Sequence, residues 1–507
     1  KIVLPGDYLP GTESARLVVA GNPLAPAAAA VRGLLDYPYG CLEQTTSRLL
    51  PLLRAADLVA ALESAPGKAA AFGREEIQNL LDKGFQRFEL MRRDGGLAMW
   101  PGAAAPWDWG TLYALDLLSL AKKEGYRVPE ELRSSLLDYA ANHVDEWVEA
   151  EDKDGRATRL PEAAYAVAVL TDAGRTPYSW LTRLEEKVRA LRERKNAPLP
   201  VSAAANLARA YLALGRPELA KELWKEAPDF LDGRMDGGSL ASRVGDTAMA
   251  LSTLLDVAPQ SPRIPEMARG LAEALAKDAT TTFENAAAFA ALAKYARGLA
   301  PDPEGKVTLK FADGHAQTVP AAKFTSFTKV KPGETVEVSV EGKSPAQLAW
   351  FTAGQNAGAA AKEEDRGVAI RREFRDLAGN RVAPDAFKSG ELYHVTLTVA
   401  PRAALRNCVI VDMLPAGLEI ENQDLRTSAK VKPAPGAAAA RELFPNHVEP
   451  RDDRLLIFAD VPAAPCRYTY LVRAVAPGEF ALPAVEIGSM YDPATISRHG
   501  AGTITVK

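Results

Sequence analysis

The feature that most constrains this fold is a change of hydrophobic period near Pro301 in a chain of 507 residues. From about Asn22 to Leu299, apolar residues recur at three- and four-residue spacing in Ala- and Leu-rich segments, which is the period of amphipathic helices. After Pro301, short runs such as "KVTLKFADGHAQTVP" alternate apolar and polar residues between Gly, Pro and Asp, as β-strands do. The sequence therefore predicts a multidomain protein in which a helical region is followed by β structure.

The helical region carries a loose internal repeat. Five Ala- and Leu-rich helices of similar texture recur at a spacing of roughly 40–50 residues, the length of a two-helix unit in repeat proteins. They contain Tyr113, Tyr165, Tyr211, Met249 and Phe289. We expect about twelve helices, or six hairpins, in an array that can stay open or close into a ring.

The β structure falls into two regions separated by a low-complexity linker, "GQNAGAAAKEEDRG". From about Val368 to the end, runs such as "ELYHVTLTVA", "NCVIVDMLPAG" and "RYTYLVRAVAPG" predict short strands joined by turns. This pattern is typical of a β-sandwich.

Charge and hydropathy exclude some classes of partner. The formal net charge of −4 gives no basic surface for nucleic acid or for an anionic membrane. No run of about 18 apolar residues and no signal-peptide layout is present. Because the sequence lacks an initiator Met, we expect a fragment or processed piece, with any targeting signal upstream of it.

Three cysteines leave one thiol without an intramolecular partner. Cys408 and Cys466 both lie in the β-rich part and could form a disulfide, whereas Cys41 lies in helical surroundings.

The stretch "YPYGCLEQTTSRLLPLL" places Cys41 at the start of a helix. Backbone N–H groups at that end lower the pKa of a thiol, and residues three apart share one helical face, so the Gln44 carboxamide can lie against the sulfur. If the carboxamide loses ammonia to the sulfur, the product is an internal thioester, which needs a dry, aromatic environment. Nearby aromatic residues that could form this environment are Tyr37, Tyr39, Trp100, Trp107 and Trp109. A packed core cysteine is the alternative interpretation, because free cysteines are commonly buried.

This stretch resembles the thioester signature of the alpha-2-macroglobulin and complement family in its bacterial form, Cys-x-Glu-Gln after glycine. The resemblance extends over essentially all 507 residues, including "RDGGLAMW", "RDDRLLIFADV" and "SMYDPATISRHGAG". It implies an α/α toroid of six helical hairpins that carries the thioester, is inserted into a CUB-like β domain and is followed by a macroglobulin-like β-sandwich. The implied boundaries are 1–20 for the first CUB-like strand segment, 21–300 for the toroid, 301–362 for the rest of the CUB-like domain and 363–507 for the sandwich.

The resemblance also assigns roles to individual residues. Cys41 and Gln44 would form the thioester, while Tyr37 and the pair Met490 and Tyr491 would shield it. Glu43 matches the motif, but we assign it no acid or base role. Family members that prefer hydroxyl targets use a histidine near the thioester, and no motif aligns His143 with that role, so amines of lysines are the expected targets.

The function implied by the resemblance is that of a broad-range protease inhibitor, acting once as a covalent trap and therefore not an enzyme. Its expected partners are proteases, captured through lysine amines, and the upstream macroglobulin-like and bait domains of the full-length chain. We expect a monomer with no cofactor, no metal and no nucleic acid. The implied location is the periplasm, with an inner-membrane lipoprotein anchor upstream.

Two other interpretations stay open. One is a binding module in which Cys41 is an inert core thiol. The other is an enzyme built on a helical toroid, but the sequence lacks the Asp-rich, zinc-type or His/Tyr clusters that such enzymes need. A Cys41–His143 peptidase pair likewise lacks a supporting signature.

Overall fold

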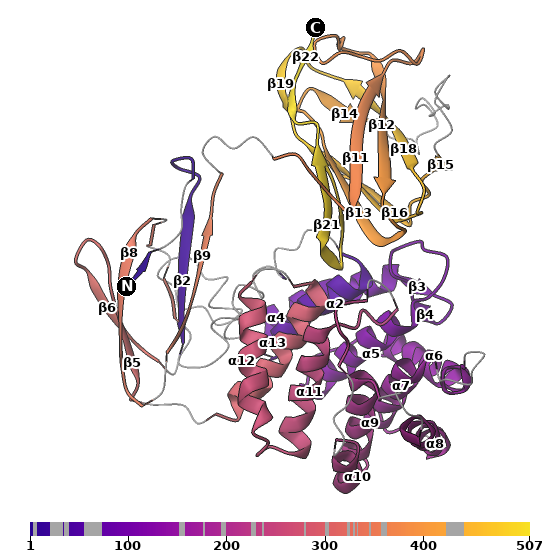
Figure 1. Cartoon of the computed structure of the whole chain (residues 1–507), viewed down its shortest axis with the longest axis vertical. Coiled ribbons are helices and arrows are strands. Elements are labelled where there is room, and N and C mark those ends of the chain that lie inside the picture. The colour runs from indigo at the N-terminus through magenta and orange to yellow at the C-terminus, as the bar shows by residue number, and fades with distance from the viewer. Residues whose placement is uncertain are drawn as a thin grey trace. The chain divides into compact units, whose positions relative to one another are not determined.

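The computed structural model describes residues 1–3, 8–20, 34, 40–54, 73–151, 158–175, 178–193, 199–224, 230–235, 238–277, 280–299, 304–321, 325–327, 330–331, 333–343, 346–355, 362–421 and 441–507. The chain divides into two units, Lys1–Ala357 and Gly358–Lys507. The first unit contains the described helices together with three small sheets, and the second contains β structure (Figure 1). The prediction of a multidomain protein with a helical part followed by β structure is therefore confirmed.

Six of the described helices form a ring of contacts: each helix contacts the next one in this set, and the last contacts the first. They are α2 (Leu42–Arg54), α5 (Asp108–Lys123), α7 (Leu160–Asp172), α9 (Val201–Ala213), α11 (Arg243–Val257) and α13 (Thr282–Arg297). Along the chain they alternate with α4 (Arg74–Leu90), α6 (Glu130–Glu149), α8 (Tyr178–Glu193), α10 (Pro217–Glu222) and α12 (Arg263–Leu275).

The composition of each set follows from its burial. In α7, residues Ala163 to Leu170 are buried apart from Tyr165, so nearly every face of this helix packs against a neighbour. In α8 only Leu181, Leu184 and Val188 are buried, at the three- and four-residue spacing of a single apolar stripe. Small alanines are favoured in the first set because helices packed on several sides must approach closely.

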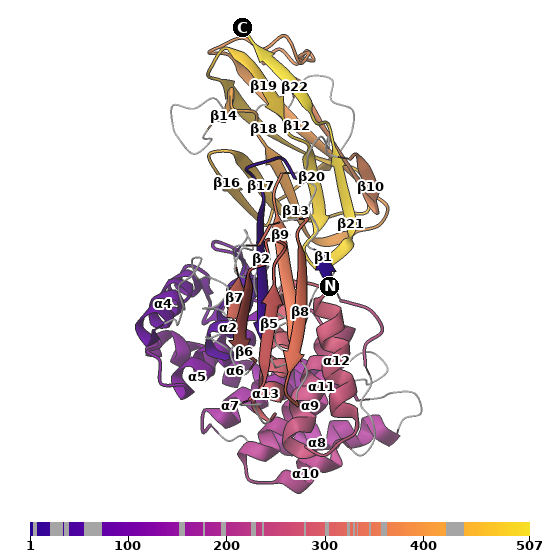
Figure 2. The same cartoon turned by 90° about the vertical axis from the view of Figure 1, so that its left-hand side faces the viewer.

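The small sheets of the first unit join chain segments from before and after the helices. Strand β2 (Ser14–Ala20) lies between β7 (Thr325–Phe327) and β9 (Gln347–Ala353), as Figure 2 shows. A four-stranded sheet has the order β1-β8-β5-β6, from Ile2–Val3, Thr335–Glu341, Lys306–Lys310 and Ala316–Pro320. In the chain, the helical region thus lies between strands that pair with one another, β2 before it and β7 and β9 after it.

A short hairpin, β3 (Arg92–Arg93) and β4 (Gly96–Leu97), lies between α4 and α5. Its turn residues Asp94 and Gly95 have φ of 45° and 84°, the left-handed values that an Asp-Gly turn adopts readily. Among the described helices, none is long and apolar enough to cross a membrane.

The second unit is built from two main sheets. The six-stranded sheet has the order β10-β21-β20-β13-β17-β16, from Glu364–Arg366, Asp492–His499, Val485–Ser489, Leu405–Met413, Arg454–Val461 and His447–Pro450. The other contains β11-β12-β18-β14, from Val368–Arg375, Leu392–Pro401, Cys466–Ala474 and Leu418–Ile420, with β15 (Arg441–Glu442) beside β18. Strands β19 (Gly478–Leu482) and β22 (Gly502–Val506) form a separate pair.

One apolar core draws on both main sheets of the second unit. Val395, Leu397 and Val399 alternate along β12, and they share the core with Ile410 of β13 and Ile457 of β17. This is the packing of a β-sandwich, and it accounts for the period-two pattern seen in the sequence.

Candidate functional site: the start of helix α2

The start of α2 has the hydrogen bonds of a capping box, with cysteine in the place of serine or threonine. The backbone N–H of Gln44 donates to Cys41 Sγ at 3.4 Å, and the backbone N–H of Cys41 donates to Gln44 Oε1 at 3.1 Å. A capping box normally pairs Ser or Thr with Glu or Gln three residues later, and Cys-Leu-Glu-Gln has the same spacing. The reciprocal bonds hold the sulfur and the carboxamide on the same side of the helix end.

Both side chains are removed from water. Cys41 is 0% exposed and Gln44 is 3% exposed. The two groups that a thioester would join are therefore adjacent and buried, although the bond itself stays a prediction.

Between these two residues, Glu43 is a completely buried carboxylate at 0% exposure. Thr282, at the start of α13, donates to both of its oxygens at 2.8 and 3.0 Å, and Ser47 donates to Oε1 at 2.5 Å. The Ser47 hydroxyl also bonds the Tyr113 hydroxyl of α5 at 3.1 Å. Burial and the nearby Glu43 carboxylate raise the pKa of Tyr113 far above its ordinary value, so that phenol stays neutral. Glu43 thus joins the start of α2 to α5 and α13.

An aromatic cluster lies beside this carboxylate. Trp109 stacks on Tyr113 at 5.1 Å between ring centroids and meets Phe283 edge-on at 5.0 Å. Trp107 lies 5.2 Å from Trp109, and Phe283 directly follows Thr282 in the chain. Of the three predicted tryptophans, Trp109 therefore contacts Tyr113, which bonds Ser47, and Phe283, which follows Thr282, while Trp107 contacts Trp109. The third, Trp100, is buried and follows Met99, whose carbonyl accepts the Leu42 N–H at 3.0 Å.

Glycine before the cysteine has a steric reason. The Arg87 Nε–H of α4 donates to the Gly40 carbonyl at 2.5 Å, and a Cβ on Gly40 would lie 2.7 Å from that Nε. A side chain at position 40 would displace the guanidinium. Sequence reasoning identified the motif glycine but could not find Arg87, because the two residues are 47 positions apart.

The predicted shielding residues are not among the described contacts at the start of α2. Tyr37, like Tyr39, lies outside the described residues. Met490 and Tyr491 form the turn between β20 and β21 in the second unit, where the Met490 N–H donates to the Asn407 carbonyl at 3.0 Å. Shielding of the thioester by these residues stays a prediction.

The base of that hairpin is held by a buried ion pair that the sequence did not reveal. Arg372 donates to the carbonyls of Pro483 and Gly500, on either side of the hairpin, at 2.5 and 3.2 Å. Its guanidinium also pairs with Asp412, which accepts a bond from the Tyr470 hydroxyl at 2.7 Å. Arg372 and Asp412 side chains are 2% and 0% exposed.

Cys408 and Cys466 lie on β13 and β18, strands of different sheets, and both are buried. The thiol of Cys466 is free, so the disulfide that the sequence left open is not formed in the structure. Burial in apolar surroundings raises the pKa of the Cys466 thiol.

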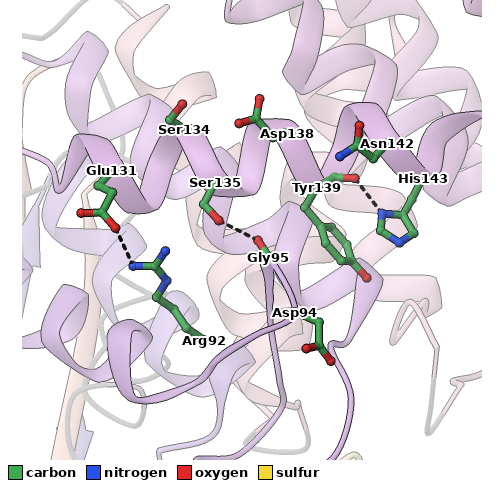
Figure 3. A pocket seen from close by; sticks show the side chains of 10 residues that line it. All are labelled: Arg92, Asp94, Gly95, Glu131, Ser134, Ser135, Asp138, Tyr139, Asn142 and His143. Atoms are coloured by element: carbon green, nitrogen blue, oxygen red, sulfur yellow. Dashed lines mark hydrogen bonds and ion pairs between the residues drawn. The ribbon is translucent and has the colours of Figure 1, made fainter.

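His143 lies elsewhere, on α6 beside the β3–β4 hairpin. It lines a hollow of about 380 Å³ together with residues such as Arg92, Asp94 and Asp138, and Figure 3 shows its ring nitrogen facing the Tyr139 carbonyl. That Nδ1–O distance is 2.8 Å, and the imidazole stacks on the Tyr139 ring at 4.1 Å. Cys41 does not line this hollow. Within the described part of the chain, no group of three or more His, Cys, Asp or Glu residues could hold a metal ion.

Most of the residues around Glu43 that the sequence did not reveal are distant along the chain from the groups they bond. Ser47 lies one turn after Glu43 and could have been suspected, but Thr282 is 239 residues away and Tyr113 is 66 residues from Ser47. The sequence "TTTFENAAAF" does predict a helix start, since Thr281 and Glu284 form a capping box. It gives no indication that the next threonine faces a carboxylate on α2.

Comparison with known proteins gives a consistent result. A family model described as the bacterial alpha-2-macroglobulin MG10 domain matches residues 367–494. The chain is 29% identical to alpha-2-macroglobulin of Escherichia coli (strain K12), over 96% of this chain and 29% of that protein. It is 25% identical to alpha-2-macroglobulin of Xylella fastidiosa (strain Temecula1), over 97% of this chain and 30% of that protein.

Solved structures match over the whole chain. Native alpha-2-macroglobulin from Escherichia coli, spanning domain MG7 to the C-terminus, has a TM-score of 0.80 at 26% identity and is covered to 81%, with 100% of this chain aligned. Salmonella alpha-2-macroglobulin reacted with methylamine has a TM-score of 0.78 at 26% identity, with 100% of this chain and 32% of that chain covered. The chain spans about three tenths of the length of the curated relatives it matches.

Proposed function

The chain belongs to the bacterial alpha-2-macroglobulin family, and we propose that it is the thioester-bearing portion of a covalent protease trap. The observation that carries this proposal is the reciprocal bonding of Cys41 and Gln44 at the buried start of α2. No other described cysteine has a carboxamide three residues away on a helix.

The chemistry proceeds in two steps. Cys41 Sγ attacks the Gln44 side-chain carbonyl carbon and ammonia leaves, which forms the thioester. A lysine amine of a captured protease later attacks the same carbon, a C–N bond replaces the C–S bond, and Cys41 is released as a thiol. A thiolate leaves far more readily than an amide nitrogen, so the stored bond acylates amines without further activation. The reaction consumes the site, and the protein is therefore a single-turnover inhibitor rather than an enzyme.

Water competes with the amine throughout, because a tethered lysine reaches only about millimolar effective concentration. The burial of Cys41 and Gln44 and the neighbouring aromatic cluster support exclusion of water before capture. We assign Tyr37, Met490 and Tyr491 to the remaining shield.

The architecture that we assign follows the same family. The closed sequence of helix contacts from α2 to α13 supports an α/α toroid, and the pairing of β2 with β7 and β9 supports its insertion into a CUB-like domain. We place these parts at 1–20, 21–300 and 301–362, with a macroglobulin-like sandwich at 363–507. The full trap would also need upstream macroglobulin-like and bait domains, and we propose a monomer in the periplasm with a lipoprotein anchor upstream.

Methylamine tests the proposal, as the name of the Salmonella structure indicates that such a protein reacts with it. Intact mass and thiol titration should show the gain of one methylamine at Gln44 and the appearance of one new thiol. The Cys41→Ala variant is the control and should show neither change. An unmodified mass and a normally titrating Cys41 thiol after prolonged incubation would overturn the proposal.

The complete burial of Cys41 also fits the second interpretation, a binding module with an inert core thiol. Unfolding in the absence of methylamine separates the two cases. If the thioester is preformed, the mass measured before water hydrolyses the bond is lower than that of the unmodified chain by one ammonia. If Cys41 is an inert thiol, the mass equals that of the unmodified chain.

A further inference from the structure

At the start of α2, two hydrogen bonds connect the Arg87 guanidinium, the Gly40–Cys41 peptide group and the Gln44 side chain in succession. The Arg87 Nε–H donates to the Gly40 carbonyl at 2.5 Å, and the Cys41 N–H of the same peptide group donates to Gln44 Oε1 at 3.1 Å. The Gly40–Cys41 peptide therefore has a cation on its oxygen and the Gln44 side-chain oxygen on its nitrogen.

In the thioester, Gln44 Oε1 is the carbonyl oxygen of the reactive bond. When an amine attacks the Gln44 acyl carbon, the C–N bond forms and the carbonyl π pair moves onto this oxygen. The intermediate collapses as the C–S pair leaves with Cys41 Sγ, and the ammonium proton passes to the thiolate. Negative charge thus develops at the atom to which the Cys41 N–H already points.

We propose that the backbone N–H of Cys41 is the oxyanion donor for aminolysis of the thioester and that Arg87 is a positioning residue that strengthens it through the Gly40 peptide. This inference rests on the proposed function. Preorganised backbone donors at such an oxygen contribute strongly because they need no reorganisation during the reaction.

Two features favour a role for Arg87 beyond packing. A charged donor on a peptide carbonyl polarises the whole amide group, and bonds in such a chain reinforce one another. The helix start adds a positive partial charge at the same end. The absence of a Cβ at position 40 allows this approach, since a Cβ would lie 2.7 Å from Nε and 2.9 Å from Cζ of Arg87.

The size of the effect can be bounded. Removing one oxyanion donor outright slows acyl transfer by about 10²–10³-fold. Because Arg87 acts through a peptide group rather than on the oxygen, we expect its loss to slow aminolysis by about tenfold.

The test measures the second-order rate of methylamine incorporation into the full chain. Arg87→Gln removes the cation, and Gly40→Ala displaces it sterically without a backbone penalty, because Gly40 does not have a left-handed φ. Each should slow the reaction about tenfold, and the double variant should be no slower than either single variant, since both changes remove the same contact. Arg87→Lys should recover part of the rate because it restores the charge.

Arg74→Gln is the matched control. Arg74 lies on the same helix and also donates to a backbone carbonyl, that of Glu124 at 2.9 Å, but not at the α2 start. This variant should react at the parent rate.

Infrared spectroscopy distinguishes an effect of Arg87 on the thioester carbonyl from an effect of the substitution on folding. With ¹³C-labelled glutamine, the thioester carbonyl band should lie at lower frequency in the parent than in Arg87→Gln, because a stronger donor weakens the C=O bond. Equal rates and equal band positions in parent, Arg87→Gln and Gly40→Ala would overturn the inference and leave the proposed function intact. Failure of the parent chain to incorporate methylamine would instead overturn the proposed function.

Discussion

The start of α2 and the centre of the sandwich each bury a cysteine and a carboxylate, yet the partners differ. Cys41 and Glu43 lie among backbone N–H groups and hydroxyls, from Gln44, Ser47 and Thr282. In the sandwich, Cys466 is packed among apolar side chains and Asp412 is paired with a guanidinium. Burial alone therefore does not distinguish a reactive region from a structural one.

The difference lies in what the polar contacts hold in place. At α2 they fix the geometry of two atoms that can react with each other. In the sandwich they fix the base of a hairpin, while the Cys466 thiol lies in an apolar core. We infer that the first region is organised for chemistry and the second for rigidity. Four sets of variants in the helical region and the sandwich test this distinction.

The largest expected difference is between the two cysteines. Cys41→Ala should abolish methylamine incorporation, because it removes the sulfur of the proposed thioester. Cys466→Ala should incorporate methylamine at the parent rate and lose about 1 kcal/mol of stability, as expected for a small cavity in the core. Intact mass after methylamine treatment and urea denaturation check both results. If Cys41→Ala incorporated methylamine fully, Cys41 and Cys466 would not differ in chemical role.

The next largest effect concerns Asp412. Asp412→Ala leaves the Arg372 guanidinium buried without its carboxylate, which we expect to destabilise the sandwich by about 3–5 kcal/mol. Hydrogen exchange along β13 during urea denaturation localises the loss. Asp453→Ala is the control, since its ion pair with Arg454 is on the surface, with the Asp453 side chain 60% exposed. That control should change stability by less than about 0.5 kcal/mol. Equal effects of the two variants would mean that Arg372 finds other partners.

A smaller loss is expected at the α2 start. Thr282→Val keeps the volume of the side chain but removes both hydrogen bonds to Glu43, which should lower the stability of the helical region by about 1.5–3 kcal/mol. Thr171→Val is the control, because the buried Thr171 hydroxyl bonds the Val167 carbonyl one turn back on its own helix. Calorimetry on both variants provides the measurement, and the control should lose less than half as much. If the two losses were equal, Glu43 would not join α2 to α13.

The features that could be predicted from sequence are local ones. The change of period separated helices from strands, since each period is set by a few consecutive residues. The Cys41–Gln44 contact follows from three-residue spacing at a helix start. Trp107 and Trp109 were expected near this end. Trp109 lies beside Tyr113, which bonds Ser47, and Trp107 lies beside Trp109.

The features that could not be predicted depend on long-range packing. Arg87 reaches Gly40 only because α4 packs on α2, and Arg372 reaches Pro483 across 111 residues. The sequence left open whether Cys408 and Cys466 form a disulfide, and in the structure Cys466 is a free thiol. The two cysteines lie in the same core but on strands of different sheets, which cysteine counting does not reveal.

The smallest effect, and the one that most sharpens the comparison, is in pH dependence. The helical region has its own Arg–Asp–Tyr contact, in which Asp116 accepts bonds from Arg209 at 2.6 and 2.9 Å and from the Tyr165 hydroxyl at 2.9 Å. Its side chain is 26% exposed, and the Arg209 guanidinium holds the pKa of Asp116 below its usual value. At Asp412, complete burial raises the pKa instead. The same three residue types therefore shift the carboxyl pKa in opposite directions. At Asp116 the Arg209 charge and the hydrogen bonds outweigh desolvation, whereas at Asp412 desolvation outweighs the contributions of Arg372 and Tyr470.

The two shifts predict opposite responses to acid. A lowered folded pKa means that Asp116 stabilises the fold above its unfolded pKa of about 3.9 and loses this contribution as pH falls through the lower folded value. Asp116→Asn should thus be less stable than the parent by about 1 kcal/mol at neutral pH, since Arg209 keeps Asp172 as a partner, and the difference should shrink on acidification. For Asp412 the raised pKa means that the folded state takes up the proton first, so the parent should gain stability relative to Asp412→Asn as pH falls. Urea denaturation of Asp116→Asn and Asp412→Asn between neutral and acidic pH checks the two signs. If both variants approached the parent equally as pH falls, the opposite pKa shifts of Asp116 and Asp412 would be overturned.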